Sequence, residues 1–268
     1  MSLPPQESNP WLSPILRLFL LLIAPLILLL GIRLLLSPSS ASDWWPWPLT
    51  FYDAVFFGSF CLAEAAAILI FLVVTRWAPG RIVIPSWVIF TSLVALVSLI
   101  NWQRFDSRRP ETWVWLGMYI TAPLLGAYFW WRYHKYPPAL PRRLPTFWQH
   151  WLSAQCIIIG LLGAGLLLIP GMLSRAWPWP LDSLTAQVFG AIFLANAVGA
   201  FLLLRTAAPI ECAAYGLPQA ILGLGAVFTL MLANAGIGQN TMLASTNLVS
   251  LLIFTAFGVS GLAYAKIR

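Results

Sequence analysis

The pentapeptide WPWPL occupies residues 45–49 and returns at residues 177–181, 132 positions further along the chain. When the chain is aligned with itself at this offset, 12 of the 28 positions in 45–72 are identical to their partners in 177–204. Self-similarity at a fixed offset is the sequence signature of an internal repeat. The chain is therefore expected to contain two related units.

The boundaries of the units follow from the same alignment. The register extends back to Pro38 and Pro170, so each unit begins well before its WPWPL segment. We predict a first repeat at residues 1–132 and a second at 148–268. Between them, residues 133–147 form a basic, Pro-rich linker.

The composition is that of a membrane protein. Hydrophobic residues make up 60% of the chain and charged residues 9%, with a mean hydropathy of +0.83, whereas a soluble domain has about 25% charged residues. A bilayer core about 30 Å thick needs roughly 20 helical residues, while a β-barrel would show alternating polarity in strands of about 10 residues. Non-alternating apolar runs of helical length lie at about 14–36, 52–74, 83–103, 112–132, 148–169, 183–204, 211–233 and 244–265. This pattern predicts an all-α, polytopic membrane protein with eight transmembrane helices.

Each predicted unit has four spans, which is an even number. Both units then enter the membrane from the same side and lie parallel, related by an axis along the membrane normal. The first run also has features of a signal peptide, because Arg17 precedes a Leu-rich core and small residues follow at 39–42. A secretory core is typically about 7–15 residues, shorter than this run, so we expect a retained helix.

Parallel repeats place both WPWPL segments on one face of the membrane. Pro cannot continue a helix, and Trp favours the headgroup region. We interpret the segments as a paired structural anchor built from interfacial aromatic loops, with a ligand-binding lip as the alternative. The side chains of these loops are Trp45, Trp47, Trp177 and Trp179.

The basic residues indicate an orientation. Ten of the 15 Lys and Arg fall on the side of the termini and five on the WPWPL side. Under the positive-inside rule both termini are cytoplasmic, although three Arg in the short segment 104–109 oppose that assignment. The basic linker could touch anionic headgroups, and because no basic domain is present we expect no nucleic-acid partner.

Few residues are arranged for catalysis. The two His lie in the linker and at the start of the fifth run, and the three Cys lie on three different runs without ligand spacing. We therefore expect no cofactor, no metal site and no catalytic residues. An intramembrane enzyme is the least favoured alternative.

One carboxyl lies inside an apolar run. Glu64 sits at the centre of the second run, and its partner in the repeat is Asn196. A charge at mid-bilayer costs at least about 2.5–3.5 kcal/mol, so such residues usually face protein or water and are often functional. Burial without a cation favours the neutral form. Glu64 either forms a structural hydrogen bond between helices or is a proton-coupling or cation site. Asn247 in the eighth run is another polar side chain that needs a hydrogen-bond partner.

Small residues run beside this position. Ser59, Ala63 and Ala67 recur at intervals of four, and Ala191, Ala195 and Gly199 repeat the row in the second unit. Such rows let helix backbones approach closely, so we expect each to pack tightly against a neighbouring helix.

The Trp-Pro-x-Pro-Leu segment, followed by a Gly/Ala-rich helix, resembles a group of uncharacterised bacterial multi-pass membrane proteins. The resemblance implies a location in the bacterial inner membrane and carries no assigned activity.

Three classes of function remain. A non-catalytic membrane subunit or scaffold, with a membrane-protein partner or self-association, predicts closely packed helices and an apolar outer groove. A transporter for a small apolar or lipid-like substrate predicts a polar path to Glu64. An enzyme predicts clustered ionisable groups. Sparse polarity in the runs argues against transport of sugars or ions in quantity and leaves an apolar or lipid-like substrate compatible. Of the three classes we favour the non-catalytic subunit or scaffold.

Overall fold

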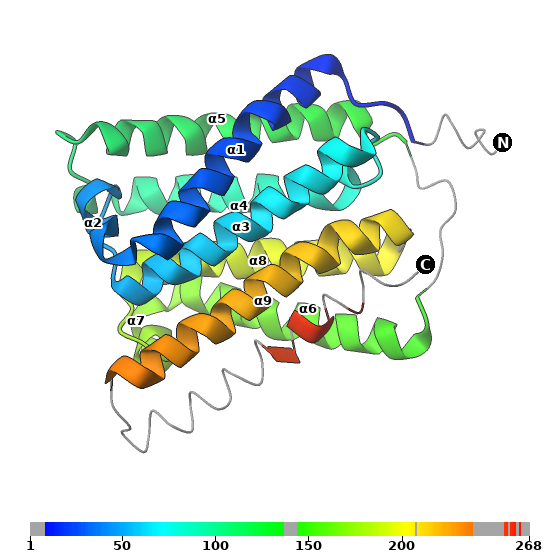
Figure 1. Cartoon of the computed structure of the whole chain (residues 1–268). Coiled ribbons are helices and arrows are strands. Elements are labelled where there is room, and N and C mark those ends of the chain that lie inside the picture. Colours follow the sequence, from blue (N-terminus) through cyan, green and yellow to red (C-terminus); the bar gives the residue numbers. More distant parts are fainter. Residues whose placement is uncertain are drawn as a thin grey trace.

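The computed structural model describes residues 9–136, 144–206 and 208–237, together with 255–256, 258–260 and 263. These residues are predominantly helical, and Figure 1 shows the long helices running roughly alongside one another. The long helices are α1 (Pro14–Leu36), α3 (Phe51–Val74), α4 (Gly80–Ile100), α5 (Pro110–Tyr133), α6 (Thr146–Leu168), α8 (Ser183–Thr206) and α9 (Pro209–Ile237). Two short helices, α2 (Ala41–Trp44) and α7 (Pro170–Leu173), and 3-10 turns at 38–40, 102–104 and 174–176 connect them.

Seven of the eight apolar runs are thus helices. Six of these helices are long and apolar enough to cross a membrane: α1, α3, α4, α6, α8 and α9. Helix α5 has 24 residues, but its Trp, Tyr and Pro content makes it less hydropathic than the others. Most of the eighth run, including Asn247, lies outside the described residues.

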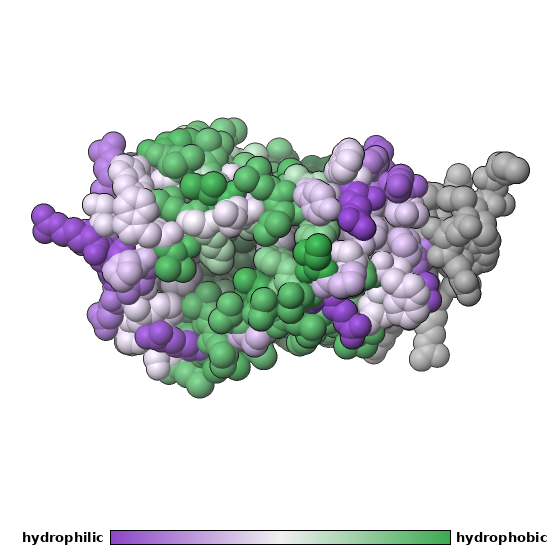
Figure 2. Space-filling model, turned by 90° about the horizontal axis from the view of Figure 1, so that it is seen from above, coloured by the Kyte–Doolittle hydropathy of each residue, from purple (hydrophilic) through white to green (hydrophobic). Residues whose placement is uncertain are grey.

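The surface is also that of a membrane-embedded protein. Many large apolar side chains are exposed on α1, α5 and α6, where a soluble protein would carry charge. Figure 2 shows a hydrophobic band between two hydrophilic ends. The ends of the bundle are therefore the parts in contact with water and headgroups.

Caps at the helix starts agree with the local sequence. The Thr50 side chain accepts a hydrogen bond from the backbone N–H of Asp53, and the Asp53 carboxylate accepts one from the N–H of Thr50, which together make a capping box. At the start of α8, the Asp182 carboxylate accepts from the N–H groups of Leu184 and Thr185. The same offset of 132 relates the bounds of α1 to α6 and of α3 to α8.

Helices from the two halves of the chain interlock. Helix α3 packs against α1 and α9, and helix α8 packs against α6 and α4. Where α6 meets α8, a Cβ added at Gly163 would lie 2.9 Å from the Gly190 carbonyl oxygen. Where α1 meets α3, a Cβ added at Gly31 would lie 3.0 Å from the Gly58 carbonyl oxygen. The two contacts are 132 positions apart, and each requires glycine for the backbones to approach this closely.

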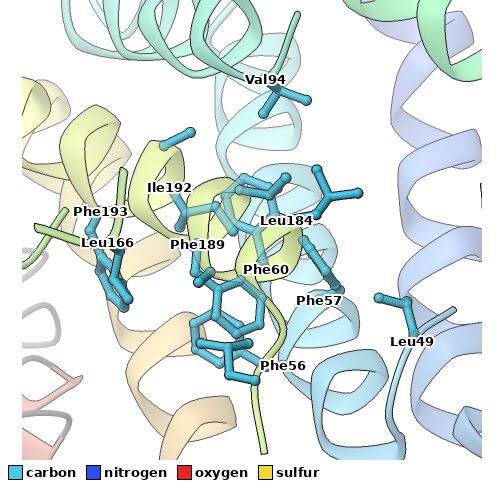
Figure 3. Close-up of a cluster of buried hydrophobic side chains, with 14 of the residues drawn as sticks. Leu49, Phe56, Phe57, Phe60, Val94, Leu166, Leu184, Phe189, Ile192 and Phe193 are labelled. Atoms are coloured by element: carbon cyan, nitrogen blue, oxygen red, sulfur yellow. The ribbon is translucent and has the colours of Figure 1, made fainter. Parts of the chain in front are cut away.

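The core lies between α3 and α8. Figure 3 shows its phenylalanines gathered from these two helices. The ring centroid of Phe189 lies 4.5 Å from that of Phe56 and 5.0 Å from that of Phe57. Tilted and edge-on pairs at such distances add to the energy of burying the rings themselves. This aromatic core holds the two halves of the chain together.

The predicted small-residue rows also lie at close contacts. Ser59 on α3 fills the space beside Gly225 of α9, and Gly199 on α8 lies against Tyr215 of α9 and Ser86 of α4. The prediction of tight packing at these two positions is confirmed.

Candidate functional site

The four tryptophans of the WPWPL segments point into the protein. Their exposed fractions are 4% for Trp45, 2% for Trp47, 7% for Trp177 and 1% for Trp179. These rings pack on each other and on Phe57 and Phe189 and are not exposed at the surface, so within the predicted interfacial aromatic loops the side chains face inward. The indole N–H groups of Trp47 and Trp179 have their hydrogen-bond partners inside the protein.

Two of the indoles make crossed hydrogen bonds between the halves of the chain. Trp47 Nε1 donates to Thr185 Oγ1 at 3.0 Å, and Trp179 Nε1 donates to Asp53 Oδ1 at 2.9 Å. Each acceptor belongs to the capping residues at the start of the opposite helix, α8 or α3. The end of the bundle that holds these contacts is called the tryptophan end below. Figure 1 shows α2 and α7 together at that end.

Glu64 and Asn196 line one small cavity at the centre of the bundle. The central cavity has a volume of about 50 Å³ and lies between α3, α4, α8 and α9. Ser86 and Tyr215 also line it. The two residues that the alignment paired, Glu64 and Asn196, thus lie at the same site in the structure. Asn247 lies outside the described residues and cannot be placed beside them.

The polar groups around the central cavity bond mainly to backbone. Asn196 Nδ2 donates to the Ile192 carbonyl at 3.0 Å, and Tyr215 Oη donates to the Asn196 carbonyl at 3.4 Å. Glu64 is half-buried, and neither ion pair found in the described ranges involves it. The Glu64 carboxyl therefore faces a space with polar neighbours and without a cationic side chain in contact.

The size of the cavity limits its contents. A water molecule needs about 10–15 Å³ of such space, so about 50 Å³ holds a few waters or a small ion, not an organic substrate. Towards the tryptophan end, the aromatic core lies beyond the cavity. Phe56 precedes Glu64 by eight residues on α3, roughly 12 Å at 1.5 Å per helical residue.

A buried ion pair that was not expected from the sequence lies at the end of the bundle opposite the tryptophan end. Arg81 Nη1 lies 2.8 Å from Glu211 Oε1, with side chains 8% and 0% exposed. Arg81 Nε also donates to the Tyr136 carbonyl, and Glu211 Oε2 accepts from the N–H of Ala208 at the start of α9. The available signal was a pair of opposite charges, with Arg81 two residues before the third run and Glu211 at the start of the seventh.

The described residues contain no group of three or more His, Cys, Asp or Glu that could hold a metal ion. Comparison with family models, with curated proteins and with solved structures finds no match for this chain. Its function therefore has to follow from its own geometry.

Proposed function

We propose that the chain is an eight-helix membrane protein made of two parallel four-helix repeats. Contacts that recur at an offset of 132 support this, namely the paired glycine contacts and the two crossed tryptophan bonds. The helix packing agrees, because α4 and α9 occupy corresponding places in the alignment and each packs on the central helix of the other repeat. Helix α5 ends and helix α6 begins at the end opposite the tryptophan end.

We place this protein in a bacterial inner membrane with both termini in the cytoplasm. Ten basic residues on the side of the termini against five on the other support the orientation. In a background without Cys, an impermeant thiol reagent added outside should label Ser42→Cys at the tryptophan end and leave Ala139→Cys in the linker unlabelled. Labelling of Ala139→Cys alone would reverse the orientation.

The function that the geometry supports best is that of a non-catalytic membrane subunit or scaffold, acting with a membrane-protein partner or a second copy. The observation that carries it is that contacts at both ends of the bundle join the two halves of the chain. The two halves are joined by tryptophan bonds at one end and by a buried ion pair at the other, around a water-sized cavity. These contacts stabilise one arrangement of helices, and a cavity of about 50 Å³ is too small for a substrate of organic size.

One observation favours a second candidate. Glu64 and Asn196 share the central cavity, and binding sites of transporters with repeats lie near the midplane where the repeats meet. A few-water cavity suits a proton or a small cation. Under this alternative Glu64 carries the proton or coordinates the cation.

Ion flux into proteoliposomes separates the two candidates. The purified chain would be reconstituted, and proton and Na⁺ or K⁺ entry driven by a gradient would be followed with a trapped indicator dye. A scaffold should give the flux of empty liposomes with wild type and Glu64→Gln alike. The transport candidate replaces it if wild type carries flux that Glu64→Gln abolishes while the exposed-site control Asp106→Asn retains it, with both variants equally stable.

A further inference from the structure

A second hollow lies on the outside of the bundle and does not include Glu64. It is a groove of about 480 Å³ between α1 and α5, with α3 and α4 as its floor. Figure 2 looks onto this face and shows a recess within the hydrophobic surface. Volumes of about 300–1,000 Å³ are typical of sites for small organic ligands. We call it the lateral groove.

The lining of the lateral groove is apolar below its rim. Leu26 and Leu30 of α1 face Val114 and Met118 of α5 across it, and Cys61 lies on the floor. The flanking surfaces of α1 and α5 are themselves apolar and exposed. The occupant must therefore be a hydrocarbon that enters sideways from the membrane.

The depth of the groove identifies the shape of the occupant. Its α5 lining runs from Pro110 at the tryptophan end to Tyr119, nine residues or roughly 13.5 Å at 1.5 Å per residue. That is less than half of the bilayer core, which is about 30 Å thick. A partner helix lying along α1 and α5 would span the whole core and extend well beyond the groove. A hydrocarbon chain belonging to one leaflet fits the observed depth.

The inner end of the groove is closed against the central cavity. Phe60 and Phe90 line both spaces, and their ring centroids are 4.9 Å apart in an edge-on pair. A chain in the groove would thus end against aromatic rings, and polar groups of the ligand would have to stay at the rim.

The rim carries charges of both signs. The Arg33 guanidinium lies over the Trp44 ring at 4.1 Å, and Arg109 donates to the carbonyl oxygen of Asp43, so the two cations contact consecutive residues of α2. The carboxylates are those of exposed Asp43 and of Glu111, the latter 3.8 Å from Arg109 Nε. Arg matches phosphate geometry, and a carboxylate suits an ammonium group.

We propose that the lateral groove is a binding site for a phospholipid whose headgroup carries both a phosphate and a primary ammonium, as in phosphatidylethanolamine. One acyl chain lies between α1 and α5, the phosphate binds Arg33 and Arg109, and the ammonium binds Asp43 or Glu111. The lipid belongs to the leaflet at the tryptophan end.

A photo-reactive phosphatidylethanolamine with a diazirine in the middle of an acyl chain provides the test. The whole chain would be reconstituted in phosphatidylcholine nanodiscs with a trace of this probe, irradiated, and mapped by peptide mass spectrometry. We expect labelling concentrated in the groove segments of α1 and α5. Excess unlabelled phosphatidylethanolamine should compete severalfold better than phosphatidylglycerol.

Matched variants make the test specific. Leu26→Trp fills the groove, whereas Leu22→Trp changes a residue of α1 that is equally exposed (61% against 62%) and lies outside the lining. Groove labelling should fall at least threefold in Leu26→Trp and remain in Leu22→Trp. Arg33→Gln should lower it as well, in contrast to Arg108→Gln, and circular dichroism and gel filtration would verify the fold of every variant.

Several results would overturn the proposal. The proposal fails if Leu26→Trp and Leu22→Trp are labelled equally, or if the labels spread evenly over all exposed helices. It also fails if phosphatidylglycerol competes as strongly as phosphatidylethanolamine, or if a second copy of the chain protects the groove. None of these readouts depends on ion flux, so the scaffold and transport candidates stand or fall separately.

Discussion

The crossed tryptophan bonds predict a difference in stability between three matched substitutions. Trp45, Trp47 and Trp179 are each 4% exposed or less, so replacing any of them by Phe removes a similar amount of buried indole. Their N–H groups differ. That of Trp45 has no hydrogen-bond partner among the described residues, that of Trp47 meets a hydroxyl, and that of Trp179 meets a carboxyl group.

The magnitudes follow from the acceptors. Trp45→Phe measures the loss of packing alone. Trp47→Phe adds the loss of a neutral hydrogen bond, which averages about 0.6 kcal/mol in membrane proteins. Trp179→Phe removes the donor to Oδ1 of Asp53, a residue that is 0% exposed, and hydrogen bonds to charged groups contribute about 1.5–3 kcal/mol. We expect Trp179→Phe to be the most destabilising of the three, by about 1 kcal/mol or more over Trp47→Phe.

The assay is the free energy of unfolding in mixed micelles, titrated with a denaturing detergent. A double-mutant cycle with Asp53→Ala isolates the Trp179–Asp53 term, because the Thr50 hydroxyl accepts from the backbone N–H of residue 53 in both backgrounds. The reasoning is refuted if Trp47→Phe costs as much as Trp179→Phe, or if the cycle gives no coupling between Trp179 and Asp53.

Two more predictions use the same assay. Gly163→Ala should destabilise the protein by about 1–3 kcal/mol, because the added Cβ would lie 2.8 Å from the Leu194 nitrogen. The control Gly117→Ala should be neutral or stabilising, because nothing lies within 4 Å of its added Cβ. Equal effects of the two substitutions would contradict close packing of α6 on α8. Arg81→Met should cost about 3–5 kcal/mol by leaving the buried Glu211 carboxylate unpaired, and Glu211→Gln added to it should recover part of that loss. A double variant as unstable as the sum of the single variants would show that the ion pair is not the source.

The helices could be predicted from the sequence, because a run of about 20 apolar residues has few alternatives in a bilayer, where every backbone polar group needs an internal partner. Seven runs became helices with ends close to those expected. The equivalence of Glu64 and Asn196 also came from the alignment, and the structure brings both to one cavity.

Which faces of these helices meet was decided by the tertiary structure. Lipid-facing and protein-facing positions are both apolar, so the sequence carries little of the amphipathic stripe that marks the buried face of a soluble helix. The inward turn of Trp47 and Trp179, the pairing of Arg81 with Glu211 and the groove between α1 and α5 each join residues far apart in the chain. Local composition determines which segments are long, apolar helices. Long-range packing, which depends on side-chain shape and on single hydrogen-bond partners, determines which helix faces contact each other.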